Sequence, residues 1–405
     1  MKLRVFSWAI YDFANTIFSM NVVSRYFPVM IIGLLGGTDL AIGISRSAAM
    51  VLVALTMPAL GAIADEKNNR KFPLIVFTLA CCGFTAALGL SQVLILELIF
   101  FGLAIYCYQS ALTFYNALLP VVAPAGRISY VSGLGVSWGY VGSITGLAAV
   151  AMLSTRVFSP YIWTSLLFVI FSLPIFFWVH DPQAAIPPAA LTKKLYRKGL
   201  LASLKRARQI PGLLRFLIGR FFVDDAMETV ILFMTVYLVR AAGYSDTRKI
   251  GYGLDEVTLY LIVATFFTII GSYIWGILTN RHGPRRMILW AIGLWLISFI
   301  GFIFTSNKTL FYLWGSLAGI GLGGVWTAER PLLINLVGAP ERLGEFFGLS
   351  ALSGRLASVI GPITWGLIAY FFEPWGVIRY KLAIGALFVM MVIGFLILRK
   401  VPDAR

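Results

Sequence analysis

Four ionisable side chains crowd one otherwise apolar stretch of the chain and are the first candidates for chemistry: Arg220, Asp224, Asp225 and Glu228. On a helix, Arg220 with Asp224 and Asp224 with Glu228 form i,i+4 pairs on one face, whereas Asp225 points about 100° away. Asp224 lies about eleven residues, or roughly 17 Å, into the stretch, which is near the middle of a bilayer. Two acids beside one arginine can exchange a proton or hold a polar solute. The alternative is a permanent ion-pair cluster that fixes this helix to a neighbour.

Three more charged residues lie in apolar stretches of the second half of the chain. Arg355 is about eleven residues into its stretch, where a guanidinium is a strong anchor for a carboxylate or phosphate. Pairing with acids on a neighbouring helix is the alternative for Arg355. Glu329 and Arg330 are adjacent in sequence and therefore point in different directions, so we expect each to meet another helix.

Polar residues in two stretches of the first half are candidates for a cavity. They are Asp12, Asn15, Asn21, Arg25, Tyr108, Gln109, Tyr115 and Asn116. Asp12 and Asn15 share a helix face, and because Asp12 lies near the start of its stretch it suits an inner gate as well as a solute contact. Structural hydrogen bonding is the alternative for these residues. Arg25 is followed by Pro28, which frees backbone carbonyls and permits a bend.

The elements that carry these residues are predicted to be membrane-spanning helices. The chain is 59% hydrophobic and only 12% charged, with a mean hydropathy of +0.87, so it has too little polar surface to enclose itself in water. Spanning the hydrocarbon takes about 20 apolar residues, and twelve such runs are present, six in each half of the chain. The runs cover residues 5–35, 42–64, 71–90, 93–120, 128–152, 161–180, 213–240, 255–279, 285–305, 309–337, 344–371 and 379–400.

The two halves repeat one pattern. A glycine closes an apolar run, a small carboxylate or amide follows four residues later, and cations come next, in Gly61–Lys71 and again 215 residues later in Gly276–Arg286. At a spacing of 213, Asp12 also matches Asp225. Internal repeats of this kind indicate duplicated architecture. We therefore predict two six-helix bundles, 1–180 and 213–405, joined by a basic linker, 181–212.

The net charge of +16 is concentrated at alternate helix junctions and in the linker, which is the asymmetry of cytoplasmic loops. Both termini and the linker are therefore predicted to be cytoplasmic, and no nucleic-acid partner is implied. The linker is expected either to form a helix on the anionic inner leaflet or to be a solvated connection.

The repeated pattern also suggests a cytoplasmic gate. Its candidate residues are Asp65, Arg70, Lys71, Asn280, Arg281 and Arg285. Free amides at a helix start favour an anion, so we expect Asp65 to dock on the start of the run 344–371 and lock the outward-facing state. Asn280 replaces the acid in the second copy, so the charged half of this lock is expected on the first copy only.

The residues resemble two known groups of transporters. The paired pattern, located between the second and third runs of each half, resembles the signature of the major facilitator superfamily, although the first copy has Asn68 and Asn69 where a glycine is usual. A narrower resemblance is to the vacuole-effluxer-like branch. It is carried by Trp8–Thr16, Tyr115–Pro120, Phe221–Asp225, Glu345–Leu349 and Gly354 with Arg355. The resemblance implies an all-α integral membrane protein of the major facilitator fold, in a branch whose fungal members are linked to amino-acid efflux after autophagy.

The combined interpretation is a secondary active transporter working by alternating access. The expected cargo is a small polar or zwitterionic solute, such as an amino acid or short peptide, with proton coupling through the acids of the run 213–240. The alternative is an exporter of an amphipathic compound, such as a drug, siderophore or lysolipid. We expect a monomer in a bilayer, most simply a prokaryotic inner membrane.

An embedded enzyme is disfavoured by the sequence. His180 and His282 are the only histidines, and no ligand spacing typical of a metal site is present. There is also no phosphate-binding Gly-x-x-x-x-Gly-Lys-Ser/Thr loop. The sequence therefore predicts no catalytic residues, no metal and no cofactor.

Overall fold

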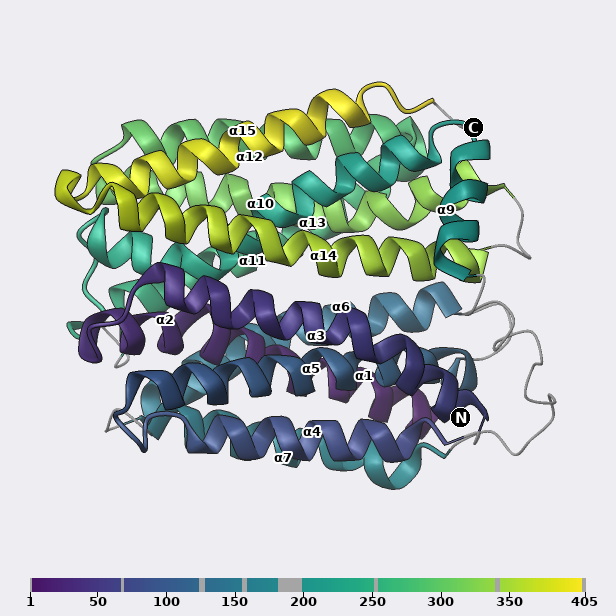
Figure 1. Ribbon diagram of the computed structural model, residues 1–405, viewed down its shortest axis with the longest axis horizontal. Helices are drawn as coiled ribbons and strands as arrows, with labels where there is room; N and C mark the ends of the chain where they lie inside the picture. Colours follow the sequence, from purple (N-terminus) through teal and green to yellow (C-terminus); the bar gives the residue numbers. More distant parts are fainter. Residues whose placement is uncertain are drawn as a thin grey trace. The chain divides into compact units, whose positions relative to one another are not determined.

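The computed structural model describes residues 2–66, 69–123, 128–154, 159–180, 199–250, 254–338 and 343–402. Nearly all of this part of the chain is helical (Figure 1). The helices of the first half are α1 (Lys2–Phe18), α2 (Phe27–Val29), α3 (Asp39–Glu66), α4 (Lys71–Ala87), α5 (Leu94–Val122), α6 (Ile128–Leu153) and α7 (Ser159–Trp178). A π-helical stretch, η1 (Ser19–Tyr26), joins α1 to α2, and a second one, η2 (Met30–Leu34), follows α2.

The second half repeats this plan after a short helix, α9 (Gly199–Gln209). Its long helices are α10 (Leu213–Arg240), α11 (Glu256–His282), α12 (Pro284–Phe304), α13 (Lys308–Val337), α14 (Leu343–Phe371) and α15 (Ile378–Leu398). A single 3-10 turn, η4 (Glu373–Trp375), precedes α15. Two short antiparallel strands, β1 (Lys249–Ile250) and β2 (Leu254–Asp255), pair Lys249 with Asp255 between α10 and α11.

The helices fit the predicted membrane spans. Within the described residues, ten helical segments are long and apolar enough to cross a membrane, the first of them running without a break from Leu3 to Leu34. The other two predicted positions are held by α4, which has only 17 residues, and by α10, which carries the charged cluster. Large apolar side chains such as Phe304 and Phe371 are 79% and 70% exposed, as lipid-facing residues are. All twelve predicted runs coincide with helices, and the predicted all-α membrane fold is confirmed.

The chain divides into two compact units. The first contains Met1–Arg197 and also Thr247–Thr258, and the second contains Lys198–Asp246 and Leu259–Arg405. Residues 247–258, which the duplication places in the second half of the sequence, therefore belong to the first unit. The predicted linker lies outside the described residues up to position 198, and α9 begins at its end.

Helix α1 is the centre of the first unit, where it contacts α5, α6 and α7. Glycine makes the contact with α6 possible, because a Cβ on Gly142 would lie 2.3 Å from the backbone oxygen of Phe13. Aromatic rings pack between α1 and α5, where Trp8 and Tyr115 stack with their ring centroids 4.4 Å apart. In the same unit α4 lies beside α7 (Figure 1).

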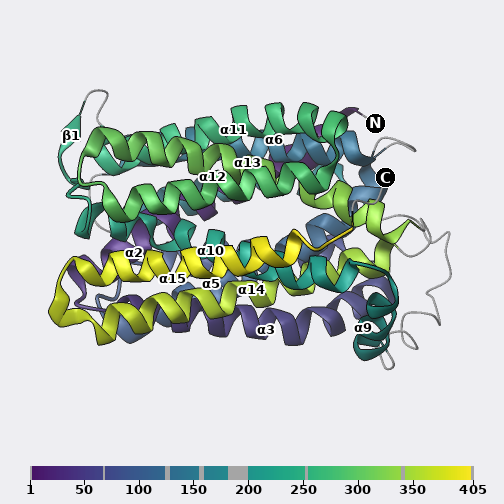
Figure 2. The same ribbon diagram turned by 90° about the horizontal axis from the view of Figure 1, so that it is seen from above.

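The second unit is built in the same way around α10, which contacts α14 and α15, while α12 packs along α13 (Figure 2). Glycines again allow close approach, since a Cβ on Gly394 of α15 would lie 2.9 Å from the oxygen of Gly219 on α10. Between α11 and α12 the chain turns at Gly283, whose φ of +86° favours glycine. Pro284 then opens α12 at a position that needs no N–H.

One buried hydrogen bond in the first unit can be tested simply. The Thr78 hydroxyl donates to the Leu74 carbonyl at 2.7 Å, so the Tyr11 hydroxyl, 2.7 Å from Thr78 Oγ1, must be the donor in that contact. We expect Tyr11→Phe to lower the free energy of unfolding by about 1 kcal/mol, because Thr78 loses a partner in a site closed to water. Thermal unfolding in detergent measures the change. Tyr273→Phe, at a ring that is 74% exposed, is the control, and equal losses from the two variants would contradict the assignment.

Candidate functional site

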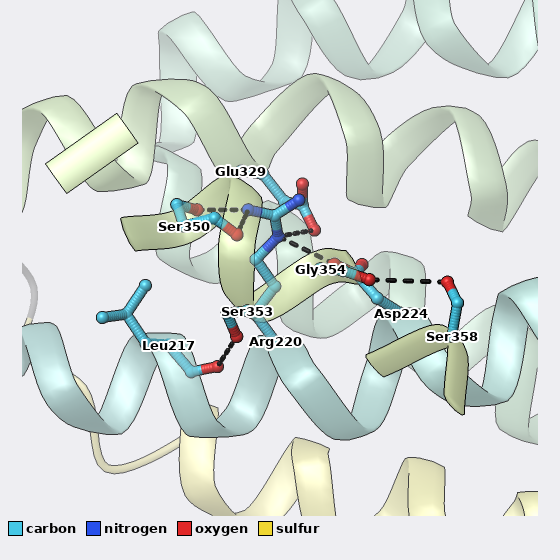
Figure 3. A network of polar contacts seen from close by, with 8 residues as sticks. All are labelled: Leu217, Arg220, Asp224, Glu329, Ser350, Ser353, Gly354 and Ser358. Carbon is cyan, nitrogen blue, oxygen red and sulfur yellow. Dashed lines mark hydrogen bonds and ion pairs between the residues drawn. The ribbon is translucent and has the colours of Figure 1, made fainter. Parts of the chain in front are cut away.

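Two charged residues of α10, Arg220 and Asp224, lie in a polar cluster of the second unit that is formed with α13 and α14 (Figure 3). Arg220 Nε is 2.9 Å from Asp224 Oδ2 one turn further along α10. The same nitrogen is 3.0 Å from Glu329 Oε1 on α13. Asp224 and Glu329 are only 5% and 7% exposed, so both acids meet one guanidinium in a site that excludes most solvent.

Helix α14 contributes hydroxyl and carbonyl groups to this cluster. Arg220 donates through one terminal nitrogen to the Ser350 carbonyl at 3.3 Å and to the Ser350 hydroxyl. Nearby, the Ser353 hydroxyl donates to the Leu217 carbonyl of α10 at 3.1 Å. Gly354 faces the same cluster, since a Cβ there would lie 3.5 Å from Arg220 and 3.6 Å from Asp224. Arg220 thus ties α10 to both α13 and α14.

The cluster has one more acid than base. When ionised, Asp224 and Glu329 bring two negative charges to the single positive charge of Arg220. One buried carboxylate oxygen, Asp224 Oδ1, accepts no hydrogen bond from the described residues. A buried carboxylate oxygen without a hydrogen-bond donor raises the free energy of the folded state. One added proton removes the excess negative charge and supplies a hydrogen to an oxygen of this kind. The arrangement is suited to binding and releasing a proton.

Asp225 has a different environment from Asp224. Proline at position 362 clashes with the carbonyl four residues earlier, and α14 is indeed kinked at Ser358, whose backbone has left the helical region (φ −79°, ψ 15°). The N–H of Gly361, freed by this kink, donates to Asp225 Oδ1 at 2.8 Å. Asp225 is fully buried, so its carboxylate joins α10 to the broken turn of α14.

The other predicted residues of the second half are distributed around the cluster. Glu228 and Arg355 are partly buried on α10 and α14, and Arg330 is exposed on α13. The Arg220–Asp224 pair follows directly from the i,i+4 spacing, whereas Ser350 was not among the predicted site residues. Its position one turn before Gly354 was the only available signal.

In the first unit three of the predicted polar residues, Asp12, Asn15 and Tyr108, form a chain of hydrogen bonds between α1 and α5. Asn15 donates to Asp12 Oδ1 at 2.9 Å, and the Tyr108 hydroxyl donates to Asn15 Oδ1 at 3.5 Å. Tyr115 is buried and its carbonyl accepts from the Trp8 indole at 3.2 Å, which is a packing contact. Gln109 is partly buried and Asn116 is exposed.

The remaining two predicted residues of the first unit lie in η1. Asn21 is fully buried and donates to the Ile17 carbonyl at 2.9 Å. Arg25 is 2% exposed and pairs with Asp255 at 2.9 Å. Asp255 was missed by the sequence interpretation, although an acid at the first residue of an apolar run is a common helix start.

The predicted gate residues are at helix ends. Arg70 precedes α4 and donates to the Ala117 carbonyl at 3.0 Å, and Lys71 is the first residue of α4. Arg285 donates to the Arg399 carbonyl at 2.5 Å, while Asn280 and Arg281 are exposed at the end of α11. The Asp65 side chain is outside the described part of the structure, so the predicted lock stays a prediction.

Comparisons with known proteins agree on the kind of molecule. The sequence profile of the family described as "Vacuole effluxer Atg22 like" matches residues 41–405. The chain is 26% identical to the uncharacterised MFS-type transporter YxiO of Bacillus subtilis, over 98% of this chain and 94% of YxiO. It is 27% identical to autophagy-related protein 22 of Kluyveromyces lactis, over 60% of this chain and 53% of that protein.

A solved structure has the same fold. A bacterial homologue of the human lysosomal transporter Spinster, in its inward-facing unoccupied conformation, superposes with a TM-score of 0.77 over 99% of this chain and 98% of its own. The two sequences are 14% identical, so this likeness concerns the fold alone.

Proposed function

The chain belongs to the vacuole effluxer Atg22-like family of major facilitator transporters, and from that premise we propose that it moves a small polar or zwitterionic solute, with Asp224 and Glu329 sharing the coupling proton. The family's members are membrane transporters and not enzymes, and this chain is a multi-pass transporter of the same kind. An amino acid or short peptide is the cargo that suits it best. Alternating access of the two bundles is the expected mode of transport.

The observation that carries the proton-coupling proposal is the pair of buried acids on one arginine. With both acids ionised, Arg220 is shared between Asp224 and Glu329. A proton on Glu329 weakens its attraction to Arg220 and leaves the guanidinium to Asp224 and Ser350. Because Glu329 is on α13 and Ser350 is on α14, protonation changes how firmly α10 is held to each helix. A proton can in this way bias a helix rearrangement.

A polar cargo fits the groups that the two units offer. The first unit presents Asp12, Asn15 and Tyr108 as hydrogen-bonding groups, and the second presents a guanidinium with serine hydroxyls. Within the first unit alone, the Asp12 carboxylate suits the ammonium group of a zwitterion and the Asn15 amide and Tyr108 hydroxyl suit its polar atoms. We place both termini in the cytoplasm on the distribution of the cations, and the membrane is taken to be a prokaryotic inner membrane.

Proteoliposomes that contain a pH-sensitive dye and receive a panel of amino acids test this proposal. We expect cargo-dependent proton movement in the native protein. Asp224→Asn and Glu329→Gln should each reduce it at least about tenfold, because neither amide can take up and release the proton. Glu373→Gln is the control, since that side chain is 72% exposed and its partner Arg379 is 3.7 Å away.

Two results would contradict the proposal. Solute uptake without proton movement would remove the coupling role of the cluster. A silent panel, together with stabilisation of the purified protein by amphipathic compounds, would favour the alternative of an amphipathic-compound exporter.

A further inference from the structure

The side of α7 that faces α1 carries buried hydroxyl groups that the proposed function does not use, and we propose that two of them, together with an amide of η1, bind a buried water molecule. The three groups are the side chains of Tyr161 and Thr164 on α7 and of Asn21 on η1. All three belong to the first unit. The inference therefore depends neither on the identity of the cargo nor on any movement of the protein.

The three side chains are closed off from solvent. Asn21 and Thr164 have no exposed surface, and Tyr161 is 1% exposed. Even so, Asn21 Oδ1, Thr164 Oγ1 and the Tyr161 hydroxyl have no hydrogen-bond partner among the described residues. A buried polar group without a partner raises the free energy of the folded state, and native proteins satisfy most such groups with protein atoms or with water.

The orientation of the Asn21 amide is determined by its other hydrogen bond. Its Nδ2 donates to the Ile17 carbonyl at 2.9 Å, so the nitrogen, and not the oxygen, is the atom on the side of that carbonyl. Ile17 lies just before the π-helical stretch Ser19–Tyr26, where the change from i+4 to i+5 pairing disturbs the normal supply of backbone donors. Asn21 Oδ1 is therefore a fixed acceptor that needs a donor from another element.

Aromatic pairs determine the register of α7 on α1. Two pairs of rings define it: Phe13 with Phe171, whose centroids are 4.7 Å apart, and Phe18 with Phe168, whose centroids are 6.2 Å apart. The residue numbers rise along α1 as they fall along α7, so the two helices are antiparallel. About one turn further along each helix, Asn21 and Thr164 lie at the same depth, where α7 contacts η1.

The face of α7 that carries the hydroxyls is also determined. Tyr161, Thr164 and Phe168 are spaced three and four residues apart, so they share one face of the helix. Phe168 shows that this face meets α1, because its ring also lies 6.1 Å from that of Tyr11. Tyr161 extends the same face toward η1, since its hydroxyl interacts electrostatically with Arg25. Both hydroxyls are therefore on the side of α7 where Asn21 lies.

A water molecule satisfies all three groups. The Asn21 oxygen can only accept a hydrogen bond, whereas each hydroxyl can donate and accept. A water that donates to Asn21 and to one hydroxyl, and accepts from the other hydroxyl, makes three hydrogen bonds, which is the usual number for a buried water. Asparagine and threonine are also smaller than the phenylalanine pair one turn away, so less side chain occupies this depth of the unit.

X-ray hydroxyl-radical footprinting of the purified protein tests for the water directly, because the radicals form from water and modify tyrosine rings beside it. We expect Tyr161 to be modified at least about fivefold faster than Tyr237, although both rings are 1% exposed. Tyr237 is the matched control, since its hydroxyl donates to the Phe302 carbonyl at 2.6 Å. In the double variant with Asn21→Leu and Thr164→Val, which leaves the water a single partner, modification of Tyr161 should fall to the rate of Tyr237.

The melting temperature of Thr164→Val tests the same site through stability. Valine keeps the shape of threonine without the hydroxyl. Loss of a hydroxyl that is bound to water should lower the melting temperature by about 2 °C, whereas loss of an unpaired hydroxyl should raise it. Ser172→Ala is the control, because Ser172 is fully buried and also without a partner among the described residues, but lies two turns further along α7. Its melting temperature should stay the same or rise.

Three results would overturn the water site. The first is a higher melting temperature in Thr164→Val, and the second is equal modification of Tyr161 and Tyr237. The third is a coupled loss of stability from Asn21→Leu and Thr164→Val without modification of Tyr161, which would show a direct hydrogen bond between the two side chains in place of water. None of these measurements involves proton movement, so the water site and the proposed function fail separately.

Discussion

Arg220→Met is expected to lower the free energy of unfolding by about 3–5 kcal/mol, since removing one partner of a buried charge cluster leaves the others uncompensated. Asp224 and Glu329 would both lose the only guanidinium within ion-pair distance that the described residues place beside them. The variant should express poorly and unfold early in a titration from mild detergent into dodecyl sulfate, which measures the change.

The control for this prediction is another arginine with a carboxylate partner. Arg379 pairs with Glu373, whose side chain is 72% exposed, and such pairs contribute no more than about 1 kcal/mol. Arg379→Met should therefore cost far less than Arg220→Met. A triple variant with Arg220→Met, Asp224→Asn and Glu329→Gln should recover most of the lost stability, because no buried charge remains. A triple variant as unstable as Arg220→Met would show that packing, and not charge, is the cause.

Gly361→Ala is expected to prevent correct packing of α14 on α10. An added Cβ would lie 2.1 Å from Thr229 Oγ1, 2.6 Å from Asp225 Oδ1 and 2.9 Å from the Asp225 backbone oxygen. Overlap of this kind costs about 1–3 kcal/mol, and more where the neighbours cannot shift. Here α10 itself would have to move, and the Gly361–Asp225 hydrogen bond would be lost with it. We expect at least a several-fold loss of monodisperse protein in size-exclusion chromatography.

Gly354→Ala, on the same helix, is the matched control for this second prediction. Its Cβ would meet Arg220 at 3.5 Å and Asp224 at 3.6 Å, which are ordinary contact distances. The yield and the melting temperature of Gly354→Ala should therefore stay near native values. If Gly354→Ala and Gly361→Ala were equally damaging, general intolerance of α14 to substitution would be the better explanation.

The parts of the structure that depend on local sequence were predictable. Long apolar runs determine the membrane helices, and i,i+4 spacing determines that Arg220 faces Asp224. The partner of Glu329 was not predictable, because it depends on which face of α13 meets α10. Adjacency to Arg330 showed only that the two side chains diverge.

Two other features could not be predicted from the sequence, for different reasons. The π-helical turn at Ser19–Tyr26 has no composition that distinguishes it from an ordinary helix, since such turns are stabilised by surrounding contacts. The pairing of Arg25 with Asp255 joins residues far apart in the chain and in different halves of the duplication. Neither half of the sequence contains both partners.

The inclusion of residues 247–258 in the first unit has a consequence for how the protein is made. The last complete helix that the structure describes in that unit, α7, ends at Trp178, whereas the last residue of the unit is Thr258. At about 5–20 residues per second, the ribosome needs roughly 4–16 s to add the residues between these two positions. During that interval Arg25 is without the Asp255 carboxylate that it contacts in the folded protein. The first unit thus receives its last residues, Thr247–Thr258, only after α10 of the second unit has been made.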